Sequence, residues 1–205
     1  MKKLDLTSLA VQFTEWFSGI AILNLSWLLF SLPLVTLVPA TDTVFEVINH
    51  WKEKGKPKEV FTLFRHTFKK NFKQSYRFGL PILIVVLVIA IDLYFLSQLT
   101  FTTTWFQIFK YAFYTLSFII LLTILYTYPL SKKMNHTSVK IFFAGFMLAI
   151  GNLKITGAIL ITLLAFLVFL SWFPAMILFV SMSGLAWIGA TAVEYASEDY
   201  PSKME

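Results

Sequence analysis

Two charged residues fall inside stretches that are otherwise apolar, and they are the first candidates for chemistry within a membrane. Asp92 and Lys110 each lie nine residues from position 101, the middle of the segment that joins two apolar stretches. In an antiparallel helical hairpin this spacing sets the two side chains at similar depth, where they are candidates for an intramembrane pair. The alternative is that both lie near the outer surface, with the Lys110 chain reaching the headgroups and Asp92 solvated.

The remaining polar residues do not show the spacing of a catalytic or metal site. The histidines, His50, His66 and His136, are not at ligand spacing with another histidine or an acidic residue, and the chain contains no cysteine. Sequence motifs for phosphate binding, zinc proteases and serine hydrolases are absent. Asn24 and Ser26 are expected to bond to a neighbouring helix rather than to a substrate. We therefore expect a protein that is not an enzyme, with no catalytic, cofactor-binding or metal-binding residues.

The composition is that of a protein embedded in a bilayer. Apolar residues make up 58% of the chain and charged residues 14%, and the mean hydropathy is +0.73; soluble domains carry roughly 25% charged residues. The 39 residues between Lys154 and Glu194 include no charge, and about 20 apolar residues span a bilayer. The predicted fold is an all-α polytopic transmembrane bundle that forms one domain, residues 1–205.

Five membrane spans are predicted, and a sixth short one is doubtful. The uncharged run after Lys154 must turn back, and Trp172, Phe173 and Pro174 mark the turn. Pro33 predicts a break near the far end of the first span. The doubtful sixth span contains Asp42 and Glu46, which are costly in lipid, so this piece is alternatively an interfacial or protein-packed helix. The five spans cover residues 16–38, 78–98, 105–130, 155–172 and 174–193, and the doubtful one covers residues 39–51.

The charge distribution predicts which loops are cytoplasmic. Residues 52–77 and 131–154 hold 13 of the 17 Lys and Arg residues, and the loops between the later spans hold none. Positive residues in short loops mark the cytoplasmic side, so both basic segments are predicted to lie there. Five spans place the N-terminus outside, whereas an N-terminus inside requires residues 39–51 to cross.

Residues 61–77 of the first basic segment have the pattern of an amphipathic helix. At 100° per residue, four phenylalanines share one face and several cations gather opposite, which predicts a helix on the membrane surface that binds anionic lipid headgroups. Residues 139–154 repeat the arrangement more weakly. Docking of another membrane complex is the alternative; no nucleic-acid motif accompanies the cations, so no nucleic-acid partner is expected. The proposed lipid or partner surface comprises Phe61, Phe64, Phe68, Phe72, Arg65, Lys69, Lys70, Lys73 and Arg77.

The N-terminal 80 residues resemble a known family. They contain Glu15-Trp16, the run from Asn24 to Phe30, Leu32-Pro33, Thr36-Leu37 and Pro39-Ala40-Thr41, and this pattern is similar to the YesL-like family of bacterial integral membrane proteins of unknown function. The resemblance implies a multi-pass protein of the bacterial cytoplasmic membrane. Genes for this family often lie beside those for carbohydrate-uptake ABC transporters and sensor components, which implies an accessory or regulatory partner of such a system. The alternative is a small transporter that uses Asp92 and Lys110.

Overall fold

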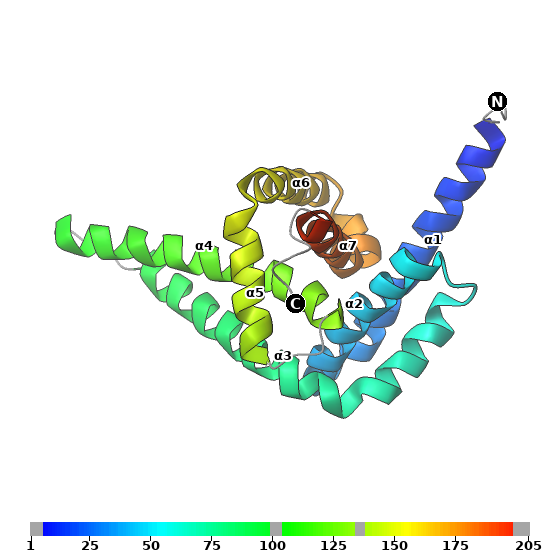
Figure 1. The fold of residues 1–205 in the computed structure, drawn as a ribbon, viewed down its shortest axis with the longest axis horizontal. Helices are drawn as coiled ribbons and strands as arrows, with labels where there is room; N and C mark the ends of the chain where they lie inside the picture. The colour runs from blue at the N-terminus through cyan, green and yellow to red at the C-terminus, as the bar shows by residue number, and fades with distance from the viewer. Residues whose placement is uncertain (1–5, 99–103, 134–137, 199–205) are drawn as a thin grey trace.

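The computed structural model describes residues 6–98, 104–133 and 138–198, and every regular element in those ranges is helical. This confirms the predicted all-α fold. Figure 1 shows the elements in chain order, with α1, α2 and the first half of α3 side by side and the α3–α4 hairpin extending away from them. The elements are α1 (Leu6–Ser31), η1 (Leu34–Thr36), α2 (Leu37–Lys54), α3 (Val60–Gln98), α4 (Thr104–Lys133), α5 (Ser138–Gly151), α6 (Leu153–Trp172), η2 (Pro174–Met176) and α7 (Ile177–Glu198).

Five of the described helices are long and apolar enough to cross a membrane, and each overlaps a predicted span. Two helices differ most from the predicted bounds. The first helix ends at Ser31, because the chain bends at Leu32 and Pro33 before η1. The second begins at Val60, because the basic amphipathic segment and the apolar span form one continuous helix, α3, of 39 residues that includes Pro81.

Helix α2, which corresponds to the doubtful sixth span, is the centre of the fold. Eleven of its 18 residues are buried, including the polar Asp42 and Asn49. It packs against α1, α3, α4 and α7. Polar residues are costly in lipid because lipid offers them no partners. Burial in protein supplies such partners to Asp42 and Asn49. The structure thus shows residues 39–51 within a helix that is packed against protein.

Helices α1 and α2 form an antiparallel hairpin. Near its tip, the Trp27 indole N–H donates to the Thr41 hydroxyl at 3.1 Å. At its base, the Lys56 ammonium donates to the backbone carbonyl of Glu15, and the Trp51 ring lies close to Gly19, where an added Cβ would stand 2.6 Å from it. The start of α1 therefore lies at the same end of the hairpin as the basic segment that follows α2.

Asn24 joins α1 to the backbone of α7. In an uninterrupted α-helix, the amides of Met182 and Ser183 donate to carbonyls four residues earlier. Here both donate to the Asn24 Oδ1 atom, at 2.8 and 3.0 Å, while Asn24 Nδ2 donates to the Leu178 carbonyl at 2.9 Å. The side chain thus enters the hydrogen-bond ladder of α7, which confirms that Asn24 bonds to a neighbouring helix.

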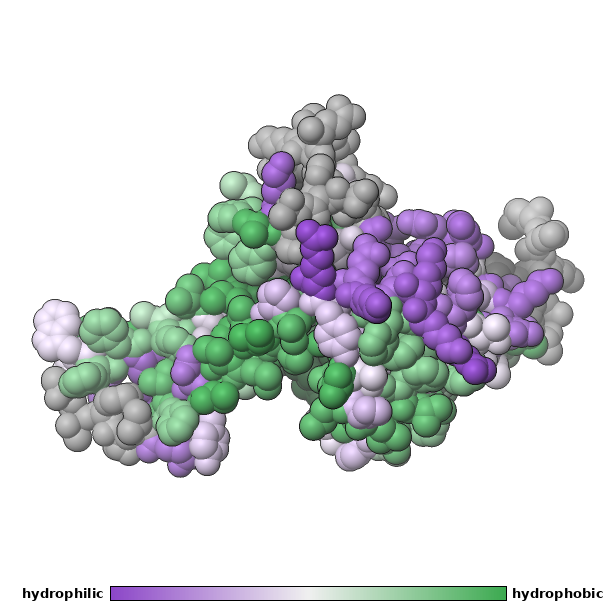
Figure 2. Space-filling view, turned by 90° about the horizontal axis from the view of Figure 1, so that it is seen from below, coloured by the Kyte–Doolittle hydropathy of each residue, from purple (hydrophilic) through white to green (hydrophobic). Residues whose placement is uncertain are grey.

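The α3–α4 hairpin carries a large outward-facing apolar surface. In the most apolar 18-residue window of each helix, only 11% of the residues are buried. Figure 2 shows this hairpin at the left as a largely apolar arm, while hydrophilic residues gather at the upper right, on the side that holds α2 and the first half of α3. The arm is therefore suited to contact lipid along both helices.

Replacing Asn24 is expected to destabilise the bundle. In Asn24→Leu, the backbone groups of Leu178, Met182 and Ser183 lose their partner, and each buried polar group left unpaired costs about 1–3 kcal/mol. We expect a clear fall in the thermal midpoint of the detergent-purified protein. Ser26→Ala is the matched control, because the Ser26 hydroxyl is also buried but bonds only to Ile22 within α1. Equal midpoints for the two variants would contradict this role for Asn24.

The hairpin also predicts the location of the N-terminus. Since the start of α1 lies beside the basic segment after α2, both are expected on the same side of the membrane. A reporter that is active only in the cytoplasm, fused to the N-terminus, should give the same signal as one inserted at Gly55. Opposite signals at the two positions would show that α1 crosses alone.

Candidate functional site

The exposed face of α3 carries the cations that the sequence analysis selected. Arg65, Lys69, Lys70, Lys73 and Arg77 are all exposed in the structure. They belong to the first half of α3, which lies against α1 and α2. The surface formed by these five residues is called the basic face below.

The aromatic face of α3 corrects a prediction. Phe64 and Phe68 were assigned to a lipid or partner surface, but their side chains are only 0% and 8% exposed. Both pack edge-on against Phe30 of α1, with ring centroids 5.4 and 4.8 Å apart. Phe72 is half-buried, and Phe61 alone of the four is exposed. The predicted surface is wrong for Phe64 and Phe68 because α1 and α2, rather than lipid, cover that face.

The predicted pair of Asp92 and Lys110 is not formed. Both side chains are half-buried, Asp92 on α3 and Lys110 on α4. The ion pairs among the described residues do not join them, and the Lys110 ammonium lies 5.8 Å from the centre of the Tyr114 ring. Counting residues from the turn predicts depth, but whether two side chains meet also depends on the rotation of each helix about its axis.

A buried ion pair joins α2, α3 and α4. The Lys132 ammonium lies 2.6 Å from Asp42 Oδ1 and 3.4 Å from Glu46 Oε2. The Ser75 hydroxyl donates to Asp42 Oδ2 at 2.6 Å. The Asp42 and Lys132 side chains are 4% and 15% exposed, and buried charges are tolerated when they are paired and hydrogen-bonded. Sequence reasoning missed this group; the signal was two acids four residues apart on α2.

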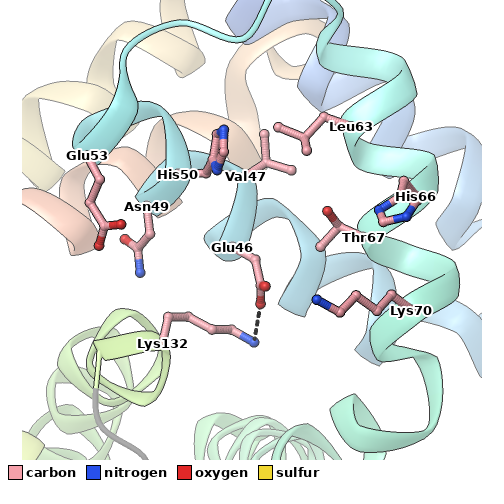
Figure 3. Close-up of a pocket in the computed structure, with 10 residues that line it drawn as sticks. All are labelled: Glu46, Val47, Asn49, His50, Glu53, Leu63, His66, Thr67, Lys70 and Lys132. Atoms are coloured by element: carbon pink, nitrogen blue, oxygen red, sulfur yellow. Dashed lines mark ion pairs between the residues drawn. The ribbon is translucent and has the colours of Figure 1, made fainter.

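A polar cavity of about 310 Å³ lies beside this ion pair. Figure 3 shows that side chains from α2 and α3 line it on two sides and that Lys132 of α4 enters from a third. The Lys70 amine and the Glu46 carboxylate point toward each other across it. Its polar lining consists of Glu46, Asn49, His50 and Glu53 from α2, His66, Thr67 and Lys70 from α3, and Lys132 from α4.

The cavity brings together residues that are far apart in the sequence. His50 and His66 both line it; His136 lies outside the described residues. Within the described part of the chain, His, Asp and Glu side chains do not form a group of three that could hold a metal ion. The lining offers carboxylates, ammonium groups, imidazoles, an amide and a hydroxyl, which suit hydrogen bonding and charge pairing with a small polar solute.

Helix α2 is also fixed to α7 by a second charged contact. The Lys52 ammonium lies 2.6 Å from Glu194 Oε2 and 2.7 Å from the Thr191 hydroxyl. It also lies 5.4 Å from the centre of the Trp187 ring, within the range of a cation–π contact. The Trp16 and Trp51 rings pack edge-on against Trp187, with centroids 5.5 and 5.6 Å away. Charged contacts thus hold α2 on two sides, to α4 and to α7.

Comparison with known proteins gives one family and two relatives. Residues 20–93 match the family described as "Protein of unknown function, DUF624". The chain is 30% identical over 133 residues to "Uncharacterized protein YesL" of Bacillus subtilis (strain 168), which covers 63% of this chain and 60% of the relative. It is 24% identical over 180 residues to "Uncharacterized protein YteU" of the same organism, covering 86% of this chain and 80% of the relative.

The match to YesL spans less than two thirds of that relative's length. Solved structures give no match. The segment that matches the DUF624 family, residues 20–93, runs from α1 through α2 into α3. It therefore contains Asn24, the α1–α2 hairpin, Asp42 and the basic face. The resemblance of this chain to the YesL-like family is thus confirmed, on the segment that builds the centre of its fold.

Proposed function

We propose that this protein is a non-enzymatic accessory or regulatory partner of a carbohydrate ABC uptake system in the bacterial cytoplasmic membrane. The observation that supports a partner role is that one side of α3 is buried in the protein while the opposite side is exposed and basic. Its aromatic side is packed against α1 and α2, while all five cations of the basic face are exposed. Because the buried side holds the helix in place, the basic face is a preorganised surface that can dock an acidic protein.

The ion pairs support a structural rather than a catalytic role for the residues that form them. Asp42, Glu46 and Lys132 form one ion-paired group, and Lys52 and Glu194 form another. Catalysis requires several convergent polar groups that are available to a substrate. The carbohydrate system is the part of the proposal that rests on the resemblance to the YesL-like family.

Anionic lipid is a competing ligand for the same five cations. Each cation near an anionic membrane surface contributes about 1 kcal/mol of attraction. Lipid binding depends mainly on the number of charges, whereas docking of a protein depends on where the charges lie. Reversing charges on the basic face and elsewhere therefore separates the two ligands.

The proposal is tested by recovering partners from native membranes in mild detergent. The intact protein should bring down a transporter or sensor subunit, and the triple variant Lys70→Glu, Lys73→Glu, Arg77→Glu should lose most of that recovery. The control reverses three exposed cations elsewhere, Lys58, Lys140 and Lys154, and should keep it. Equal loss in both variants would indicate general attraction to lipid.

A transport assay gives the result that would overturn the accessory role. If the purified protein is recovered alone and carries a substrate flux in proteoliposomes, it is a transporter in its own right. Loss of that flux in Asp92→Asn would place Asp92 on the path. We expect no flux above that of empty vesicles, and no difference between Asp92→Asn and the unchanged protein.

A further inference from the structure

The turn between α1 and α2 presents an apolar surface. Leu32, Leu34 and Val35 are 75%, 83% and 73% exposed, and they are followed by Thr36, where η1 ends. The 26 residues between Glu15 and Asp42 carry no charge. Turns that face water are rich in Gly, Asn, Asp and Ser, so this turn, residues 32–36, lacks the composition expected of an aqueous loop. It is called the apolar tip below.

Several polar backbone groups of the apolar tip have partners within the protein. The Thr36 hydroxyl lies 2.5 Å from the Phe30 carbonyl oxygen and 2.6 Å from that of Pro33, and the Thr36 amide donates to Pro33 at 2.7 Å. The Leu37 amide donates to the Leu34 carbonyl, and the Tyr76 hydroxyl donates to the Val35 carbonyl. Pro33 has no N–H to satisfy. Each such partner lowers the cost of placing a chain reversal in the hydrocarbon of a bilayer.

The ion pair with Lys132 limits how deep the apolar tip reaches. Lys132 ends the fourth helix in a segment whose charges predict a cytoplasmic location. Asp42, 2.6 Å from it, lies six residues after Thr36, which is about 9 Å along a helix at 1.5 Å per residue. The hydrocarbon core is about 30 Å thick. The apolar tip therefore ends about one third of the way across from the level of Lys132.

We propose that the α1–α2 hairpin is re-entrant and that its apolar tip is an interaction surface for lipid acyl chains, ending within the hydrocarbon of the bilayer. Both ends of the hairpin then lie on the side of the basic segments. The occupant is hydrocarbon because the exposed side chains are aliphatic, the surrounding 26 residues are uncharged, and several backbone groups of the tip are bonded within the protein. This inference goes beyond the proposed partner role and does not depend on it.

The chain has no native cysteine, so single cysteines can report the location of the tip in the full-length protein in cells. Maleimides react with the thiolate, which does not form in hydrocarbon. We expect Leu34→Cys and Val35→Cys to react with a membrane-impermeant maleimide neither in intact cells nor in inside-out vesicles. Two exposed positions serve as controls: Ser97→Cys, near the end of α3, should react in intact cells, and Lys58→Cys should react in inside-out vesicles. Full labelling of every variant after unfolding in SDS confirms that each thiol is present.

A measurement of the depth of residue 34 in the bilayer shows whether the absence of labelling results from burial in hydrocarbon. A bimane dye attached to the introduced thiol of purified Leu34→Cys protein can be reconstituted in vesicles that contain nitroxide-labelled lipids. We expect stronger quenching by nitroxides along the acyl chains than by nitroxides at the headgroup. Labelling of Leu34→Cys from the outside would show a complete crossing, and labelling from the inside or strongest quenching at the headgroup would show a surface hairpin; each of these results overturns the proposal.

Discussion

The buried carboxylate of Asp42 is the constraint on which the rest of the structure depends. Its side chain is 4% exposed, and an isolated buried charge is far too costly to persist. Lys132 and Ser75 supply its partners from α4 and α3. Breaking such a group by removing one partner costs about 3–5 kcal/mol. These bonds therefore fix the position of helix α2 relative to α3 and α4. Contacts with lipid or apolar packing alone would restrict that position less.

A polar helix at the centre explains the arrangement of the others. Lys132 and Lys52 give α2 charged contacts to α4 and to α7. The apolar sides of α1 and of the first half of α3 pack around the remaining surface of α2. Asn24 then fixes α1 to α7 by bonding to backbone rather than to side chains. The longest apolar surfaces, on α3 beyond Pro81 and on α4, are left to face outward. Several of the buried polar side chains, among them Asn24, Asp42 and Asn49, thus join one helix to another.

Sequence reasoning predicted the helices and the exposed cations more accurately than the contacts. Long uncharged runs can only be apolar helices in a bilayer, so the five candidate spans were predictable. The cavity was not, since His50 and His66 are 16 positions apart and meet only because α2 and α3 are antiparallel. The ion pairs of the described residues do not join Asp92 to Lys110, and equal depth alone does not bring two side chains on neighbouring helices together.

By itself the sequence determined that the chain is helical, that five stretches are long and apolar enough to cross a membrane, that cysteine is absent and that the cations concentrate in particular loops. These properties follow from composition and spacing alone. Only the tertiary structure decided which apolar faces are covered by protein. The 3.6-residue period of Phe61, Phe64, Phe68 and Phe72 is the same whether lipid or another helix lies against it. Burial of Phe64 and Phe68 beside Phe30, and of Asp42 beside Lys132, depends on contacts between distant segments, which no local pattern records.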